Sequence, residues 1–298
     1  MGAHTRTCAG VLPAMAPPGE GALPSALPDL SSGALFGVAG KHCLVTGGGR
    51  GIGLMVAAGL VANGASVYIV SRTAKVCDAV AAALSARGPG TCVSLGGADL
   101  STDAACVELA SRLKQHTGRL HVLVNNSGTS WGEPMDKFPD KAWSKVFDLN
   151  VKAVFNLTRA CLPLLRAAGS HADPARVVNV GSVAGIRPQA WPTYSYDVSK
   201  AAVHHLTTKL AGELAGERVT VNALAPGLVP SKMSDQLAAY ASKDQIAASV
   251  PLGRVGSAED MAGAVLYFAG RAGAWTSGVT LVVDGGALAG VSSIKAKL

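Results

Sequence analysis

The sequence predicts an α/β fold: one domain in which helices cover both faces of a doubly wound parallel sheet of about seven strands. Short β-branched apolar runs alternate with longer runs of helical periodicity from Lys41 onward. These runs carry apolar residues on both faces, which is typical of strands buried on both sides. A glycine-rich turn joins the first strand to the first helix, as in alternating βαβ units.

The strand and helix candidates follow one another along the chain without a gap that would mark a second domain. The predicted strands are 42–46, 66–71, 91–95, 120–124, 176–180, 218–223 and 279–283. The predicted helices are 52–63, 74–87, 102–117, 140–167 and 196–215. In such sheets a ligand lies beyond the carboxyl ends of the strands, so the loops after the strands should carry the chemistry.

Composition agrees with one packed domain, because 49% of the 298 residues are hydrophobic and only 15% are charged. No apolar stretch reaches the length of about 18 residues that a membrane span needs, so no membrane partner is expected. The six cysteines have no paired spacing, which predicts reduced thiols packed as small apolar groups and no metal site. They are Cys8, Cys43, Cys77, Cys92, Cys106 and Cys161.

The net charge of +7 raises the question of an anionic partner. Lysine and arginine are spread along the chain and only 5% of the residues are aromatic, so a nucleic-acid surface is not expected. A phosphorylated cofactor or a thioester substrate fits the charge better. A basic surface without any partner remains an open alternative.

The two ends of the chain differ in composition from the domain predicted at 39–290. Residues 1–38 are rich in Ala, Gly and Pro, which predicts a disordered leader. Residues 291–298 form a predicted tail ending in Ala296-Lys297-Leu298, which resembles a variant of the Ser-Lys-Leu tripeptide bound by the peroxisomal import receptor. We therefore expect a peroxisomal location, with a cytoplasmic one if the tripeptide arose by chance.

The stretch Thr46–Gly53 predicts a dinucleotide-binding turn of the Rossmann type. It lies between a strand and a helix, and glycine there permits backbone angles closed to other residues and lets a phosphate approach main-chain N–H groups. The predicted cofactor contacts in it are Gly47, Gly49, Arg50, Gly51, Ile52 and Gly53.

The end of the second strand indicates which dinucleotide binds. Ser71 and Arg72 stand where an acidic residue would bond the ribose hydroxyls of NAD, and Arg50 lies nearby. Their charge favours the 2′-phosphate of NADP(H). The alternative is that Arg72 is a solvated residue at a helix start.

Two further loops predict cofactor contacts. Asp99 and Leu100 follow the third strand, where the carboxylate either bonds the adenine or caps the next helix. Asn125–Gly128 follows the fourth strand, where the amides, including that of Asn126, tie strand ends together and the glycine admits the ribose. A plain turn is the alternative for Asn125–Gly128.

The acid–base chemistry is predicted at Ser182, Tyr196 and Lys200. Tyr196 and Lys200 are four residues apart and share a helix face, so the ammonium is placed to lower the pKa of the phenol. Tyr194 has Val198 in the corresponding position and lacks such a partner. Ser182 ends the fifth strand, where it can donate to a substrate oxygen.

Taken together, these motifs resemble the short-chain dehydrogenase/reductase superfamily over about residues 40–288. The resemblance implies that Tyr196 donates a proton, that Lys200 also binds the nicotinamide ribose and that Ser182 positions the carbonyl. It further implies that Asn150, in Leu149-Asn150-Val151, holds a water in a proton relay. Pro226, Gly227 and Val229 are the remaining cofactor contacts that it suggests.

Within the superfamily the chain is most similar to bacterial NADPH-dependent 3-oxoacyl reductases of the rhamnolipid-associated type. That resemblance implies a small-molecule carbonyl substrate, with an acyl-CoA as one candidate, and a homo-tetramer or homo-dimer formed through 140–167 and 196–215. The interval from Ser182 to Tyr196 is one residue longer than usual, which bears on the shape of the pocket.

Two other functions stay open at this point. The chain could reduce or oxidise a small ketone, a sugar or a secondary metabolite, or it could be a non-catalytic NADP-binding sensor or scaffold. The adjacent His204 and His205 point in different directions on a helix, which favours packing or a subunit contact over metal binding.

Overall fold

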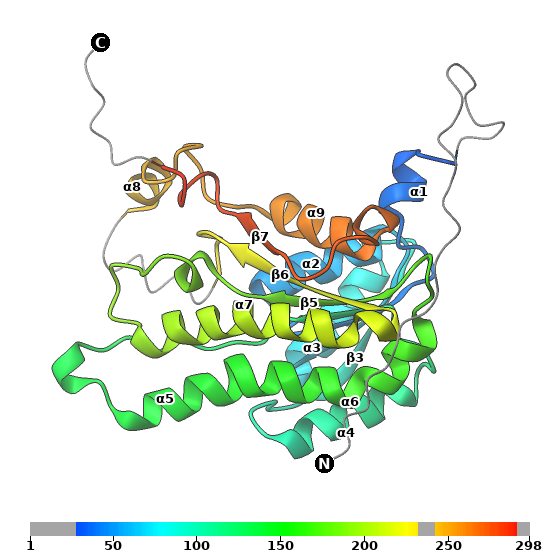
Figure 1. Cartoon of the computed structure of the whole chain (residues 1–298), viewed down its shortest axis with the longest axis horizontal. Coiled ribbons are helices and arrows are strands. Elements are labelled where there is room, and N and C mark those ends of the chain that lie inside the picture. The colour runs from blue at the N-terminus through cyan, green and yellow to red at the C-terminus, as the bar shows by residue number, and fades with distance from the viewer. Residues whose placement is uncertain (1–27, 232–241, 291–298) are drawn as a thin grey trace, which may run out of the picture.

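A computed structural model describes residues 28–231 and 242–290 and confirms the predicted fold class (Figure 1). Seven parallel strands form one sheet in the order β3-β2-β1-β4-β5-β6-β7. The strands are β1 (His42–Thr46), β2 (Ser66–Ser71), β3 (Thr91–Gly97), β4 (Val122–Asn125), β5 (Ala175–Val180), β6 (Val219–Pro226) and β7 (Thr280–Val283). Each of them overlaps a predicted strand.

Helices cover both faces of the sheet, as predicted. Figure 1 shows α2 (Gly51–Ala62) and α9 (Ala258–Ala269) on one side of the strands and α6 (Ala153–Ala168) and α7 (Tyr194–Leu214) on the other. The remaining α-helices in the described ranges are α1 (Ser32–Phe36), α3 (Ala74–Ser85), α4 (Asp103–Lys114), α5 (Asp140–Phe147) and α8 (Lys243–Ala248).

Each central strand contributes side chains to two separate hydrophobic cores. In β1, Cys43 and Val45 pack with α2 and α9, whereas Leu44 between them packs with α4 and α6 on the other face. Successive side chains of a strand point to opposite faces, so a strand buried on both sides is mainly apolar. This is why the strands appear in the sequence as largely apolar runs.

The strand order reverses between β1 and β4, which are neighbours in the sheet although β2 and β3 separate them in the chain. Loops that leave two such strands diverge to opposite faces and open a crevice at the carboxyl edge. The turn after β1 and the loop after β4 therefore form the two walls of the predicted ligand site.

The helix predicted at 140–167 is interrupted. α5 and α6 are joined by a π-helical turn over Asp148–Lys152, and Asn150 lies in that turn. One extra residue in the turn rotates the side chains relative to an unbroken helix. The rotation lets the Asn150 side chain hydrogen-bond the backbone of the loop after β4, as shown below.

Two helices near the C-terminus and one near the N-terminus were not predicted. α8 and α9 lie in a region for which the sequence analysis proposed no helix, although Ser257 and Asp260 form a capping box at the start of α9. The short α1 lies inside the segment 1–38 that was predicted to be a disordered leader, so part of that segment is helical. Residues 1–27 and the tail 291–298 lie outside the described ranges.

The cysteines of the described ranges are packed as predicted. Five of them are buried and unpaired, and burial raises the pKa of Cys43, Cys92 and Cys161 to about 12. Cys8 lies outside the described residues. In the part of the chain that is described, no helix has the length and apolar character required to cross a bilayer.

Candidate active site

The glycine turn after β1 adopts the backbone that its sequence predicts. Gly47 and Gly51 have φ values of +68° and +53°, which residues with a Cβ rarely adopt. A Cβ on Gly53 would lie 2.4 Å from the carbonyl oxygen of Gly47, so the turn and the first turn of α2 are in direct contact. A larger residue would be strained by the backbone angle at positions 47 and 51 and would collide with the Gly47 carbonyl at position 53.

The turn presents the N-terminus of α2 to the crevice. The first turn of that helix contains no acidic residue, and its N-cap residue, Arg50, forms no side-chain cap. Free N–H groups and the positive end of the helix dipole together favour an anion at this point. These features fit the pyrophosphate of a dinucleotide.

The residues expected near a 2′-phosphate lie at the end of β2. Arg72 and Arg50 are exposed, and neither forms an ion pair with a carboxylate in the described ranges. The Ser71 hydroxyl contacts the Cys77 thiol at 3.0 Å, and Gly49 packs beside both side chains. Two unpaired guanidinium groups leave this edge positively charged.

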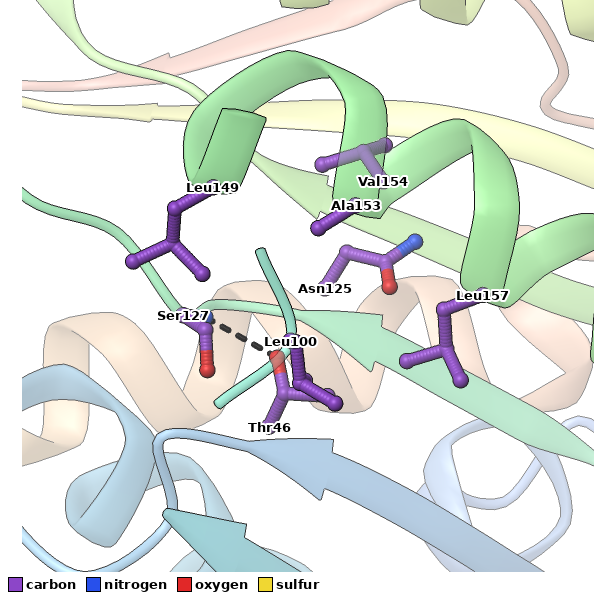
Figure 2. Close-up of a pocket in the computed structure, with 8 residues that line it drawn as sticks. All are labelled: Thr46, Leu100, Asn125, Ser127, Leu149, Ala153, Val154 and Leu157. Atoms are coloured by element: carbon purple, nitrogen blue, oxygen red, sulfur yellow. Dashed lines mark hydrogen bonds between the residues drawn. The ribbon is translucent and has the colours of Figure 1, made fainter. Parts of the chain in front are cut away.

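The loop after β3 differs from one expectation. The Asp99 carboxylate accepts a hydrogen bond from the Ser101 N–H at 3.1 Å, but the N-cap of α4 is Thr102, so Asp99 does not cap that helix. The Leu100 side chain is buried and lines a cavity of about 10 Å³ between the strand ends and α6, drawn in Figure 2. That cavity holds at most about one water.

The loop after β4 is tied to the end of β1, as predicted for its amides. The Asn126 side chain donates to the Thr46 carbonyl at 2.8 Å. The Thr46 hydroxyl accepts the backbone N–H groups of Asn126 and Ser127, each at 2.9 Å, and Figure 2 shows the second of these bonds. A Cβ on Gly47 would lie 2.8 Å from Asn126 Nδ2, so this loop and the glycine turn are in contact.

Asn150 connects the loop after β4 to α7. Its side chain accepts the Thr129 N–H at 2.9 Å and donates to the Thr129 carbonyl at 3.0 Å and to the Ser199 hydroxyl at 2.9 Å. Ser199 in turn donates to the carbonyl of Tyr196 at 2.7 Å. Since Asn150 is 1% exposed, all of its amide groups are committed within the protein.

Ser182, Tyr196 and Lys200 converge as predicted. The side chains of Ser182 and Tyr196 share a hydrogen bond, and the Ser182 hydroxyl also accepts the Ala184 N–H at 3.1 Å. Lys200 Nζ lies 5.5 Å from the centre of the Tyr196 ring and donates to the Val180 carbonyl at 2.7 Å. A hydroxyl, a phenol and an ammonium group thus meet at the end of β5.

This cluster is joined to the cofactor crevice through Gly128. A Cβ at that position would lie 3.3 Å from Asn150 Oδ1 and 3.8 Å from Lys200 Nζ. The glycine therefore brings the loop after β4 against both polar groups.

The electrostatics of the pair differ from the prediction. Burial raises the pKa of Tyr196, the hydrogen bond with Ser182 opposes that rise, and the charge of Asp197 adds to it. Burial also lowers the pKa of Lys200 to about 8. The Tyr196 pKa is thus raised rather than lowered as predicted: burial is the largest cause, and the Lys200 ammonium points at the Val180 carbonyl.

The last three predicted cofactor contacts, Pro226, Gly227 and Val229, lie at or just after the end of β6. Pro226 is the final residue of the strand, and the Gly227 N–H donates to the Val283 carbonyl at 2.9 Å. The Val229 side chain is buried in the core and packs against Gly256. Only the backbone of Val229 is therefore placed to meet a cofactor.

A larger cavity of about 300 Å³ lies beside this strand end, apart from the Ser182–Tyr196–Lys200 cluster. Leu228, Val250, Arg254 and Asp284 are among its lining residues, and Arg254 is paired with Asp260. None of the three clustered residues lines it.

Sequence reasoning missed two residues that organise the site. The Thr46 hydroxyl accepts hydrogen bonds from the loop after β4. Its position as a polar residue at the end of an apolar strand could have indicated this role. His204 accepts the backbone N–H of Ser182 at 3.4 Å, a contact between residues far apart in sequence. The sequence analysis assigned His204 to packing or a subunit contact.

Comparisons with known proteins agree with this geometry. A sequence profile described as short chain dehydrogenase matches residues 41–241. The rhamnolipids biosynthesis 3-oxoacyl-[acyl-carrier-protein] reductase of Pseudomonas aeruginosa is 46% identical over 252 residues, covering 84% of this chain and 97% of that protein. The short-chain dehydrogenase/reductase PhomF of Diaporthe leptostromiformis is 35% identical, covering 89% and 97% of the two chains.

A solved structure gives the same result. The RhlG/NADP active-site complex of Pseudomonas aeruginosa superposes with a TM-score of 0.80 at 45% identity, covering 85% of this chain and 98% of that one. Both the profile and the relatives extend over most of the sheet and its crevice. This chain belongs to the short-chain dehydrogenase family of oxidoreductases.

Proposed function

We propose that this protein is an NADP(H)-dependent carbonyl reductase whose substrate is a 3-oxoacyl thioester. The observation that carries the proposal is the hydrogen-bonded pair Ser182–Tyr196 with Lys200 one helical turn away, facing a loop that also contacts the glycine turn. The 46% identity to a 3-oxoacyl reductase supports the substrate class, and the net charge of +7 fits an anionic thioester.

Residues already described would hold the dinucleotide. The glycine turn and the N-terminus of α2 would bind the pyrophosphate, and Arg50 and Arg72 would bind the 2′-phosphate. The loop around Asn126 and the buried Lys200 would bind the nicotinamide ribose. When bound, the reduced nicotinamide supplies the hydride that the carbonyl carbon accepts.

The protein groups act on the carbonyl oxygen. Ser182 donates a hydrogen bond that orients this oxygen, and the Tyr196 phenol transfers its proton to it as negative charge develops. Lys200 stabilises the phenolate that remains. Asn150 holds the backbone of Thr129 and, through Ser199, the first turns of α7, and we assign to it the support of the relay that returns a proton to Tyr196.

The test is a panel of carbonyl compounds with NADPH, followed by the loss of cofactor absorbance. We expect turnover with acetoacetyl-CoA and longer 3-oxoacyl thioesters. Tyr196→Phe should lower kcat by about a hundredfold or more, the scale of a general acid. Tyr194→Phe is the matched control, since Tyr194 packs edge-on against Phe138 and lacks the Lys200 and Ser182 contacts.

Two outcomes would contradict the proposal. Turnover of simple ketones or sugars but not of thioesters would keep the reductase and reject the substrate. Binding of NADPH without turnover of any compound would instead support a sensor or scaffold.

We also propose a homo-oligomer, a dimer or a tetramer. Large apolar side chains are exposed on the helices expected to meet a second copy, namely Trp143 on α5, Phe155 on α6 and Val198 on α7. Light scattering should show more than one chain per particle, and Phe155→Lys should shift the mass downward. A monomeric wild type would exclude the proposal.

Peroxisomal import is proposed on the sequence Ala296-Lys297-Leu298 alone, which lies outside the described residues. The import receptor would be the partner. A tagged protein lacking Leu298 should move from peroxisomes to the cytoplasm. An unchanged distribution would reject this location.

A further inference from the structure

His204 lies on the same face of α7 as the two proposed catalytic residues of that helix. Tyr196, Lys200 and His204 follow one another at intervals of four residues, so their side chains stack along one stripe. The first two reach the candidate active site. The third is partly buried under the turn that carries Ser182.

The imidazole contacts this turn at both ends. His204 Nε2 accepts the Ser182 backbone N–H at 3.4 Å, and the ring also hydrogen-bonds the backbone of Gly185. A Cβ on Gly181 would lie 2.1 Å from His204 Nε2, so the ring fills the space that any larger residue at 181 would need. The ring therefore packs against the backbone of Gly181, Ser182 and Gly185.

The direction of the Ser182 hydroxyl depends on these backbone bonds. The Gly181 N–H donates to Leu224 of β6 at 2.7 Å, and the Gly185 N–H donates to the Ser182 carbonyl at 3.0 Å. Neither bond involves the Ser182 N–H, for which His204 is the acceptor. Without that acceptor, the peptide plane between Gly181 and Ser182 has one restraint fewer.

We propose that His204 is a positioning residue for the carbonyl reduction: it holds the backbone of Ser182 so that the hydroxyl meets Tyr196 and the substrate oxygen. The role requires a neutral ring with Nε2 free of a proton, because only that form accepts the Ser182 N–H. Protonation would turn Nε2 into a donor facing another donor.

The surroundings favour the neutral ring. Burial lowers the pKa of His204, and the nearby charge of Lys200 lowers it further, whereas the bond to Gly185 opposes this. The turn from Ser182 to Gly185 contains no charged side chain, and none occurs in β6. The charged group that acts on the ring is therefore Lys200, one turn earlier on α7 itself.

Three variants test the proposal, which rests on the reductase activity proposed above. His204→Leu removes the acceptor, and His204→Gln restores an acceptor that cannot take up a proton. His205→Gln is the matched control, since the neighbouring side chain is exposed on another face of the same helix.

For His204→Leu we expect kcat to fall about tenfold, the scale of one hydrogen bond, with little change in KM or NADPH affinity. His204→Gln should recover most of kcat and should keep its activity at acidic pH where the wild type loses it. His205→Gln should behave as the wild type. Equal kcat in the wild type and His204→Leu would overturn the proposal. So would a loss of activity at acidic pH in His204→Gln that matches the loss in the wild type.

A second measurement does not depend on turnover. Hydrogen exchange of the Ser182 amide should accelerate about tenfold or more in His204→Leu and return toward the wild-type rate in His204→Gln. Unchanged exchange would overturn the positioning role even if no substrate were found. Absence of turnover in the wild type, together with accelerated exchange in His204→Leu, would reject the reductase and keep the structural contact.

Discussion

Burial acts in opposite directions on the two ionisable groups of the candidate active site. It raises the pKa of Tyr196 and lowers the pKa of Lys200 to about 8. The phenol therefore carries its proton across neutral pH, which suits a proton donor in reduction. The reverse oxidation needs the phenolate as a base, which burial disfavours.

This balance predicts opposite pH profiles for the two directions. Reduction should be greatest near neutral pH and should fall as the pH rises past about 8, because Lys200 loses the charge that stabilises the phenolate product. Oxidation of the hydroxy product should be slow at neutral pH and should rise only at the high pH at which the raised pKa of Tyr196 lets the phenol ionise. Initial rates measured in both directions across this range check the prediction, and oxidation that is fastest at acidic pH would contradict it.

The proposed contact of Arg72 with the 2′-phosphate leads to a prediction about cofactor choice. Arg72→Asp should invert the preference for NADPH over NADH, changing the ratio of kcat/KM values by about a hundredfold, since a charge-assisted bond is replaced by repulsion. Arg87→Asp makes the same charge change at an exposed position beyond the end of α3 and should leave the ratio unaltered. A wild type that prefers NADH would reject the assignment of Arg72.

At the scale of elements, the π-helical turn between α5 and α6 is the feature that places Asn150. Its three hydrogen bonds join the loop after β4 to α7. An unbroken helix would direct this side chain elsewhere. The turn is therefore part of the site rather than an irregularity of the scaffold.

Asn150→Ala should weaken both fold and activity. The variant leaves the Thr129 N–H and carbonyl and the Ser199 hydroxyl without their partner, which should lower the free energy of unfolding by about 1–3 kcal/mol. Asn156→Ala in α6 is the control, because Asn156 lies at a less buried position outside the turn. Denaturant unfolding and kcat measurements should both show a larger loss for Asn150→Ala than for Asn156→Ala. Equal free energies of unfolding in the two variants would refute the role of the turn.

The site was predictable where local spacing carries the chemistry. The glycine turn, the amide of Asn126 and the four-residue interval from Tyr196 to Lys200 each depend on neighbours in sequence. The π-helical turn was not predictable, because a helix with one extra residue keeps nearly the same apolar pattern. The partnership of His204 with Ser182 joins a helix to a strand end, and no spacing rule connects them.

The fold was predictable for a related reason. Strands apolar on both faces and their alternation with helices specify a covered parallel sheet. α9 was not predicted, although Ser257 and Asp260 have the spacing of a capping box at its start. The pKa of Tyr196 was also mispredicted, since burial in the folded protein competes with the neighbouring charge and cannot be judged from the helix pattern alone.

At the scale of the whole molecule, one buried arginine links the N-terminal end of β5 to the C-terminal end of α9. Arg176 of β5 is 1% exposed and donates to the carbonyls of Phe268 and Gly270 at the end of α9, at 3.1 and 2.9 Å. It also pairs with Asp173, which bonds Lys41 ahead of β1. The network lies at the edge of the sheet opposite the active site.

Arg176→Met should destabilise the protein strongly without altering the chemistry. Two carbonyls and a carboxylate lose their donor, which should lower the free energy of unfolding by about 2–5 kcal/mol. Arg166→Met, which breaks the exposed pair with Glu217, should have a much smaller effect. Unfolding curves give the difference, and a stable Arg176→Met protein with normal kcat would contradict the assigned role.

The contact between Gly181 and the His204 ring also constrains how this sequence can drift over evolutionary time. A side chain can enter position 181 only after the imidazole has been replaced by something smaller, because both compete for the same volume. Substitutions at the two positions should therefore occur in a fixed order. Among descendants of this chain, a residue larger than glycine at 181 should be found only beside a diminished residue at 204.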